Sequence, residues 1–283
     1  MAESLMEWSA GKTWYKTEGQ GEPLVVIHGG PGYPHFYLEG LLALASSERQ
    51  VIVYDQLGCG FSKANEGFEQ WSVSLFVEEL ANLQAQLGLE RMALLGHSWG
   101  ASLAVEYSLA YPDRASRLLL ASPLFDSQLW VEEARRLQDA MPGGQLMQSH
   151  EQAGTTDGEE YQKLYAEFLL RHDCSIIPKP PELEASSAHF GLEVYNHMWG
   201  PSETVVSGAL KQWSCLDRLK GIGCPVLITS GSMDSATPRQ VAAGAQLIQD
   251  MRWQLFPAAT HSLHLEYPQQ FLQTVESFLS ETA

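Results

Sequence analysis

The sequence of 283 residues contains only four cysteines, few basic side chains and no long apolar run. The cysteines are Cys59, Cys174, Cys215 and Cys224, and no two of them form a Cys-x-x-Cys pair. This spacing argues against both a disulfide framework and a zinc site. We therefore expect free thiols, no bound metal and a location in the reducing cytoplasm.

Basic residues are scarce, since Lys and Arg number 17 against 34 Asp and Glu, for a formal net charge of −17. So negative a field repels nucleic acids and anionic membrane surfaces, and we expect neither as a partner. No apolar stretch approaches the roughly 20 residues that cross a bilayer. The first eight residues carry neither a basic segment nor an apolar one, so we expect no signal peptide.

Short apolar runs alternate with amphipathic segments in the first and last parts of the chain. We predict an edge strand near 12–17 and buried strands at 24–27, 50–54, 91–95, 117–121, 225–229 and 253–256. Amphipathic helices are expected at 74–87 and near the C-terminus. Strands that alternate with helices predict an α/β fold with a mostly parallel sheet, whose ligands bind at the carboxyl ends of the strands.

The middle of the chain, residues 124–216, departs from this pattern. It favours helices, is interrupted by Gly and Pro at 142–144, 154 and 178–181, and contains no convincing buried strand. We interpret it as a helical cap, inserted between core segments 1–123 and 217–283.

A Gly-x-Ser-x-Gly motif, Gly96-His97-Ser98-Trp99-Gly100, stands between the predicted strand at 91–95 and a helix of small residues that begins at Gly100. A serine at so sharp a strand-to-helix turn needs small neighbours, and the turn presents its hydroxyl near the N-terminus of the helix. The flanking strand and helix argue against a chance match in a loop. We predict that Ser98 is a nucleophile.

A serine nucleophile needs a base, and the base needs an acid that orients it. When a serine stands on such a turn, the acid follows a late strand and the histidine follows the last one. Asp234 comes after the strand at 225–229 and His261 after the strand at 253–256, so we assign them as acid and base. Asp234 would also suit a turn. Asp55 and His264 are the alternatives for the two roles.

The oxyanion of a tetrahedral intermediate needs two preorganised N–H donors. Trp99, directly after the nucleophile, is expected to supply one of them. The other should come from the loop His28-Gly29-Gly30-Pro31-Gly32, since glycine lets the backbone approach a ligand closely. We assign Gly30 and keep Gly29 as the alternative.

Three motifs together resemble the proline iminopeptidase (prolyl aminopeptidase) family of α/β-hydrolase serine peptidases. They are the HGGPG loop at 28–32, the segment DQLGCGFS at 55–62 and the serine motif. The segment YNHMWGPSE at 195–203 is similar to a cap motif of that family. The resemblance implies release of one N-terminal residue, preferentially proline or another small apolar residue, from short peptides or amino acid amides. It implies an acyl-enzyme and no cofactor.

The resemblance also implies which residues bind the substrate. In the family, the cap glutamate that matches Glu203 receives the substrate's free ammonium, and Gly29, Tyr195 and Trp199 are expected beside it. A carboxylate in a partly desolvated cap pairs with a cation and rejects an acylated N-terminus.

Two positions depart from the family's pattern. Ser235 follows the predicted acid where many members have a second glutamate, and Phe36 stands where an acidic residue is common. Because both changes remove negative charge, a small-molecule esterase, lactonase or amidase with the same triad stays open as the alternative. A catalytically silent hydrolase-fold receptor is expected to lack a triad member, and this chain has candidates for all three.

Overall fold

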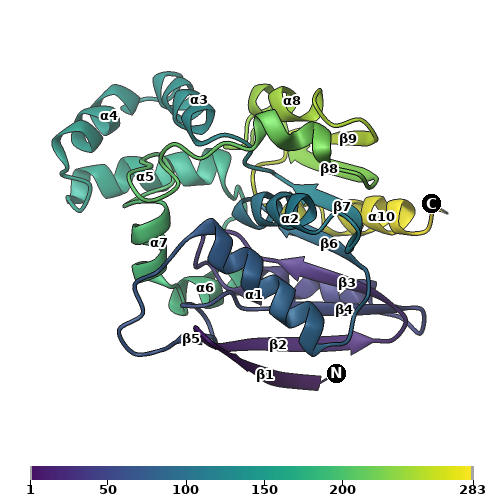
Figure 1. Ribbon diagram of the computed structural model, residues 1–283. Helices are drawn as coiled ribbons and strands as arrows, with labels where there is room; N and C mark the ends of the chain where they lie inside the picture. The colour runs from purple at the N-terminus through teal and green to yellow at the C-terminus, as the bar shows by residue number, and fades with distance from the viewer. Residues whose placement is uncertain (1, 282–283) are drawn as a thin grey trace.

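One twisted β-sheet forms the centre of the computed structural model, which describes residues 2–281 (Figure 1). The nine strands of this part of the chain run in the order β1-β2-β4-β3-β6-β7-β8-β9, with β5 paired to β2. The pairs that involve β2 are antiparallel, and the pairs from β4 through β9 are parallel. The strands are β1 (Ala2–Trp8), β2 (Gly11–Gly19), β3 (Glu22–Ile27), β4 (Arg49–Tyr54), β5 (Lys63–Ala64), β6 (Met92–His97), β7 (Ala115–Ala121), β8 (Val226–Gly231) and β9 (Met251–Phe256).

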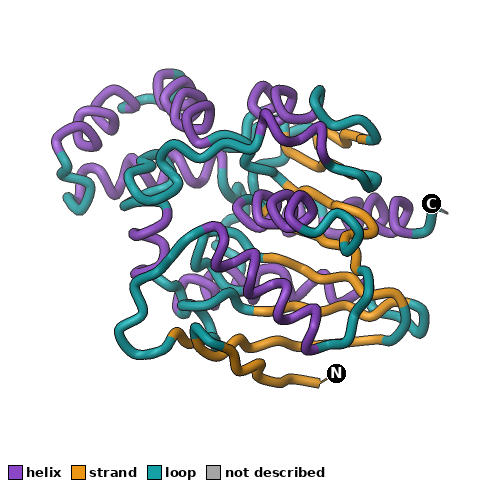
Figure 2. Tube along the Cα trace, viewed as in Figure 1, coloured by secondary structure: helices purple, strands orange, loops and turns teal. Residues whose placement is uncertain are grey.

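Helices cover both faces of the sheet (Figures 1 and 2). Helices α1, α2 and α8 pack on one face, and the 3₁₀ helix η1 and α10 pack on the other. Within residues 2–281, no helix combines the length and apolar character needed to traverse a bilayer. The helices of the two core segments are η1 (His35–Leu44), α1 (Val73–Gln86), α2 (Trp99–Ala110), η2 (Leu216–Gly221), α8 (Pro238–Ala245), α9 (Leu263–Glu266) and α10 (Pro268–Leu279).

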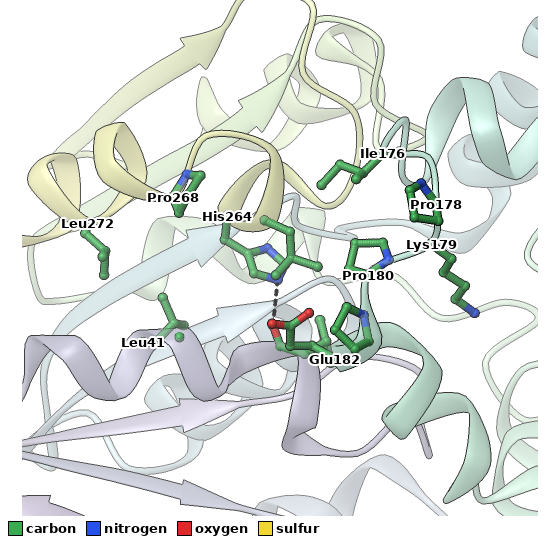
Figure 3. A pocket seen from close by; sticks show the side chains of 13 residues that line it. Leu41, Ile176, Pro178, Lys179, Pro180, Glu182, His264, Pro268 and Leu272 are labelled. Atoms are coloured by element: carbon green, nitrogen blue, oxygen red, sulfur yellow. Dashed lines mark hydrogen bonds between the residues drawn. The ribbon is translucent and has the colours of Figure 1, made fainter.

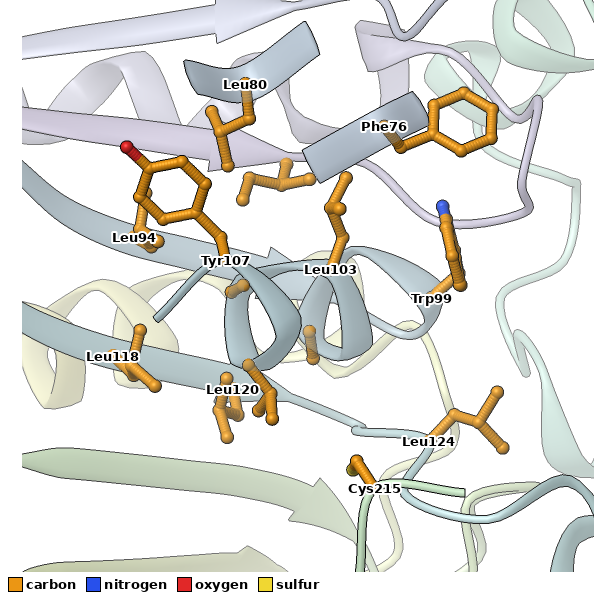
Figure 4. Packing of buried hydrophobic residues seen from close by; sticks show 14 of the residues in the cluster. Phe76, Leu80, Leu94, Trp99, Leu103, Tyr107, Leu118, Leu120, Leu124 and Cys215 are labelled. Carbon is orange, nitrogen blue, oxygen red and sulfur yellow. The ribbon is translucent and has the colours of Figure 1, made fainter. Parts of the chain in front are cut away.

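Successive side chains of the central strands enter two separate apolar cores. On β3, Ile27 belongs to the core beneath α1 and α2, whereas Val26 belongs to the core beneath η1 and α10. Figure 4 shows the first core, in which Phe76 of α1 and Leu103 of α2 pack with Leu94 of β6. Burial on both faces explains why these strands are continuous apolar runs rather than alternating ones.

The predicted α/β fold with a mostly parallel sheet is confirmed, and the expected strands and helices lie within a few residues of the observed ones. One expectation was wrong: the strand near 12–17 is not at an edge. It forms the middle of β2, which pairs with β4 on one side and with β1 on the other. The edge strand is β1, whose side chains are largely exposed and therefore carry no pattern of alternating burial.

The inserted segment is helical, and Figure 1 shows its helices gathered beyond one end of the sheet. Helix α6 packs on η1, which joins this segment to the core domain. The inserted helices are α3 (Ser127–Asp139), α4 (Gly144–Ala153), α5 (Glu159–His172), α6 (Pro181–Ala188) and α7 (Leu192–Met198). This arrangement is consistent with the predicted cap.

Candidate active site

Ser98 occupies a strained turn between β6 and α2. Its backbone angles are φ 56° and ψ −121°, and φ is positive although serine has a Cβ atom. Both glycines of the motif are needed sterically. A Cβ atom on Gly96 would lie 2.2 Å from the carbonyl oxygen of Gly100, and one on Gly100 would lie 2.2 Å from that of Ile27. Strain of this kind persists only where the surrounding fold enforces it, and it occurs preferentially at functional sites.

Asp234 and His261 are brought together at the carboxyl ends of β8 and β9. Their side chains are nearly fully buried, and Nδ1 of His261 lies 2.7 Å from Oδ1 of Asp234. Asp234 is itself held in place, because its carboxylate accepts hydrogen bonds from Ser122 Oγ at 2.6 Å and from the Ala236 N–H at 2.7 Å. An acid fixed in this way can hold the imidazole in one tautomer and orientation.

The charge surrounding His261 favours its protonated form. Burial lowers the pKa of His261, but the carboxylates of Asp234, Asp173 and Glu203 outweigh burial and raise that pKa to about 9. A base whose pKa is raised in this way accepts a proton readily once it is neutral.

His264, the alternative base, lies elsewhere. Figure 3 shows the His264 ring in a neighbouring pocket, and its Nε2 lies 3.2 Å from the backbone oxygen of Tyr37. Burial lowers the pKa of His264 to about 4, and it forms no bond to Asp234. His261, and not His264, contacts the predicted acid, and His261 stays the predicted base.

Asp55, the alternative acid, is occupied in holding two loops. It accepts hydrogen bonds from the backbone N–H groups of His35 at 3.0 Å and Phe61 at 2.9 Å, and it contacts His35 Nδ1 at 2.7 Å. Burial raises its pKa, but the His35 contacts outweigh burial, so the pKa of Asp55 is lowered. Asp55 therefore supports the loop beside the cavity rather than His261.

The two glycines considered for the oxyanion site differ in their backbone surroundings. The Gly29 N–H donates a hydrogen bond to the hydroxyl of Tyr37 at 2.8 Å, so it is already engaged. Gly30 has a φ of +111°, a conformation that a side chain would disfavour. Both glycines line the cavity that contains Ser98. Gly30 stays the predicted donor, since the Gly29 N–H is already engaged.

The motifs of the three loops hold one another in position through buried hydrogen bonds. The Gln56 N–H donates to Nε2 of His28 at 2.8 Å, and the Gln56 side-chain amide donates to the His28 carbonyl oxygen at 2.7 Å. The indole of Trp99 donates to Oε1 of Gln56 at 2.8 Å. Burial lowers the pKa of His28 to about 4, which keeps it neutral and able to accept from Gln56. Gln56 therefore connects the glycine loop to the residue after the nucleophile.

A cavity of about 320 Å³ lies between the cap and the carboxyl ends of the strands. Its wall includes Ser98 and His261 from the core and Tyr195 and Glu203 from the cap. Oε1 of Glu203 accepts a hydrogen bond from the Tyr195 hydroxyl at 2.9 Å. Burial, and next the charge of Asp173, raise the pKa of Glu203 to about 7.

Trp199, expected to bind substrate, does not line this cavity. It is buried behind the wall, where its indole donates to the Ser202 carbonyl oxygen at 3.1 Å and its ring packs edge-on against Trp130. Trp199 therefore supports the loop that carries Glu203.

Two residues near the site could not be predicted from the sequence. Asp173 follows the last residue of helix α5 and lines the cavity, and Trp130 of α3 packs edge-on against the His261 ring with centroids 5.9 Å apart. Neither belongs to a motif, and both reach the site only because the cap folds back over the sheet. Within residues 2–281, no group of three or more His, Cys, Asp and Glu side chains is placed to hold a metal ion.

The fold and the site together define a serine hydrolase of the α/β-hydrolase class, and the model of the alpha/beta hydrolase fold matches residues 22–268. The proline iminopeptidase of Heyndrickxia coagulans is 36% identical over 270 residues, which cover 94% of this chain and 93% of that protein. The crystal structure of proline iminopeptidase from Mycobacterium smegmatis superposes with a TM-score of 0.91 at 35% identity, covering 98% of this chain and 97% of the other. The structure of VinJ gives a TM-score of 0.92 at 33% identity, covering 98% of both chains. The chain belongs to the proline iminopeptidase family.

Proposed function

We propose that the protein releases an N-terminal residue, preferentially proline or another small apolar residue, from short peptides or amino acid amides. Ser98 attacks the carbonyl carbon while His261 accepts the serine proton, and His261 then gives this proton to the leaving amine. Asp234 holds the imidazole in place. Water, deprotonated by His261, hydrolyses the acyl-enzyme and frees Ser98.

The oxyanion of each tetrahedral intermediate is bound by the N–H groups of Gly30 and Trp99 in this proposal. Two backbone donors that are fixed before the reaction stabilise developing negative charge without reorganisation. The Gln56 bonds to His28 and Trp99 support this role, because they set the distance between the two loops.

The position of Glu203 is the observation that carries the proposal. Its carboxylate lies in the same cavity as Ser98 and is oriented by the Tyr195 hydroxyl. A carboxyl group with a pKa raised to about 7 ionises more readily when a cation binds beside it. A substrate ammonium supplies that cation, and an acylated nitrogen does not.

The cavity's size and wall favour a small apolar side chain. Its volume of about 320 Å³ is at the small end of ligand pockets, which span about 300–1,000 Å³. Tyr33, Leu183 and Phe190 supply apolar wall. Such a wall suits a pyrrolidine ring better than a long or charged side chain.

Kinetics on three substrates test this function: a prolyl arylamide, its N-acetylated form and a simple acyl ester. We expect efficient turnover of the free amide and little of the acetylated one. Glu203→Gln should raise KM for the free amide about 10-fold or more, since it removes a charge-assisted bond, and should change KM for the ester little. Glu184→Gln, an exposed acid on α6, is the matched control. Equal turnover of blocked and free amides would refute an aminopeptidase.

An esterase, lactonase or amidase that needs no ammonium is the second candidate. It is favoured by Ser235, a neutral residue after Asp234, and by the apolar wall of the cavity. This function predicts that the acyl ester is the best of the three substrates and that Glu203→Gln leaves all three rates similar.

The setting we propose is the cytoplasm, with small peptides as partners. All four cysteines are unpaired in the described structure, and three are buried, which suits a reducing compartment.

A further inference from the structure

His97, the second residue of the serine motif, lies where three loops meet. It ends β6 directly before Ser98, and its side chain is nearly fully buried. It lines the cavity that contains Ser98, and the centroid of its ring lies 4.7 Å from that of the His261 ring. The mechanism proposed above gives His97 no role.

Both ring nitrogens of His97 lie within hydrogen-bond distance of a partner. Nε2 is 3.0 Å from the His261 carbonyl oxygen, and Nδ1 is 2.9 Å from the hydroxyl oxygen of Tyr37. Burial lowers the pKa of His97 well below its usual value, which keeps the ring neutral. Because a carbonyl oxygen can only accept, Nε2 carries the ring proton, and Nδ1 then accepts from the Tyr37 hydroxyl.

The Tyr37 hydroxyl extends these hydrogen bonds to the glycine loop. Its oxygen accepts from the Gly29 N–H at 2.8 Å, while its proton is donated to His97. Gly29 is also close to the nucleophile, since a Cβ atom on Gly29 would lie 3.2 Å from Cβ of Ser98. Tyr37 belongs to η1 and is nearly fully buried, so water does not compete for these bonds. One chain of hydrogen bonds therefore joins the glycine loop, the serine turn and the loop of the candidate base.

We propose that His97 and Tyr37 are positioning residues, which fix the glycine loop and the candidate base relative to the nucleophile. This inference rests on the triad of the proposed function and does not depend on which substrate is cleaved. Oxyanion donors and a base lower the barrier most when they are in place before the reaction. A displacement of about 1 Å can reduce the rate about 100-fold. Loss of the bonds that set these positions should therefore slow the reaction without weakening substrate binding.

Tyr37→Phe tests the role of the hydroxyl. Phenylalanine keeps the ring that lines the cavity and removes the oxygen between Gly29 and His97. With a prolyl arylamide and with a simple acyl ester, we expect kcat to fall about 10- to 100-fold and KM to stay within about twofold. Tyr107→Phe is the matched control. It removes a buried hydroxyl that bonds Gln84 in the core beneath α1 and α2, and kcat should not change.

A double-mutant cycle tests whether the two side chains act through one another. In His97→Gln, the amide nitrogen reaches the place of Nε2 and can still donate to the His261 carbonyl oxygen, but no atom remains at the place of Nδ1. His97→Gln should therefore keep more activity than His97→Ala. In the His97→Gln background the link to Tyr37 is already missing, so Tyr37→Phe should lower kcat by less than about twofold further.

Thermal melting separates positioning from folding. Both phenylalanine variants lose one buried hydroxyl, so both melting temperatures should fall by similar amounts. Rates are then compared at a temperature at which every variant is folded. We expect a loss of kcat in folded Tyr37→Phe and none in folded Tyr107→Phe, and equal rates in the two would overturn the inference.

Two further outcomes would also overturn it. A double variant whose loss equals the product of the two single losses would show that the side chains act independently. A loss confined to KM would show that the Tyr37 hydroxyl binds substrate instead of positioning the loops.

Ser98→Ala and the choice of substrate separate this inference from the proposed function. If Ser98→Ala keeps activity, the triad is refuted and the inference with it. If Ser98→Ala is inactive and Tyr37→Phe is as active as the parent, the inference fails alone. If the parent hydrolyses only the acyl ester and Tyr37→Phe slows that reaction, the proposed function fails and the inference stands.

Discussion

The indole nitrogen of Trp130 donates a hydrogen bond to the backbone carbonyl oxygen of Glu203 over 2.7 Å. The same Trp130 ring packs edge-on against His261. One side chain of helix α3 therefore contacts both the candidate ammonium anchor in the cap and the candidate base in the core. The substrate anchor and the triad are linked by packing, not only by proximity to a shared cavity.

Trp130→Phe should separate these two contacts, because phenylalanine keeps an aromatic ring against His261 and removes the N–H donor. A neutral hydrogen bond contributes about 0.5–1.5 kcal/mol, so we expect KM for a prolyl arylamide to rise about 2- to 12-fold. The kcat for a neutral ester should change little. Trp213→Phe is the control, since it removes an indole bond to Glu106 far from the cavity. A large loss of kcat on both substrates would show that the substitution also disturbs the ring contact with His261, which contradicts this prediction.

Ser98→Ala should abolish turnover without harming the fold. The alanine keeps a Cβ atom at the same positive φ, so the backbone strain of the turn is unchanged. We expect the rate to fall at least about 1,000-fold and the melting temperature to stay that of the parent. Steady-state kinetics and differential scanning calorimetry measure the two quantities. Retained activity would refute Ser98 as the nucleophile.

Ser98→Gly offers a test of the strain itself. Glycine adopts a positive φ without steric cost, which offsets its greater freedom in the unfolded chain. The glycine variant should therefore be as stable as the alanine variant or up to about 1 kcal/mol more stable. Chemical denaturation compares them, and a clearly less stable glycine variant would show that the turn is not strained.

His261→Ala should mainly reduce activity, whereas His264→Ala should mainly reduce stability. The first removes the ring that pairs with Asp234, so activity should fall at least about 1,000-fold. The second removes a buried ring that packs on Tyr37 and Phe271, so it should keep most activity and lower stability by about 1–3 kcal/mol. Rates and melting curves of the two variants decide the assignment, and the reverse pattern would exchange the roles.

The pH profile should follow deprotonation of His261. Burial lowers its pKa, but nearby carboxylates raise the pKa to about 9, and only the neutral imidazole can accept the serine proton. For a neutral ester, kcat/KM should therefore rise with pH and level off above about 9. Glu203→Gln removes a negative charge that stabilises the imidazolium, so the rise should move to lower pH. Initial rates across neutral and alkaline pH test the sign, and a shift to higher pH would contradict it.

Most of the fold and the core of the site could be predicted because their signals are local. A buried parallel strand must be an apolar run, and a serine on a sharp strand-to-helix turn must have glycines beside it, as Gly96 and Gly100 show. Asp234 and His261 could be assigned from chain order alone, since strand ends of a parallel sheet converge. The edge strand β1 was missed because an exposed strand has no burial pattern to display.

The chain by itself therefore determines the sheet, the strand-to-helix turn at Ser98 and the family, because each depends on residues that are neighbours along the sequence. Only the tertiary structure decides which cap residues face Ser98. It places the acid Asp173 in the cavity wall and Trp199 behind that wall, although neither outcome is visible in the spacing of residues. The physical reason is that these positions depend on how the inserted helices fold back over the sheet, and the bonds that hold residues 172 and 173 join them to residues about 60 to 90 positions away.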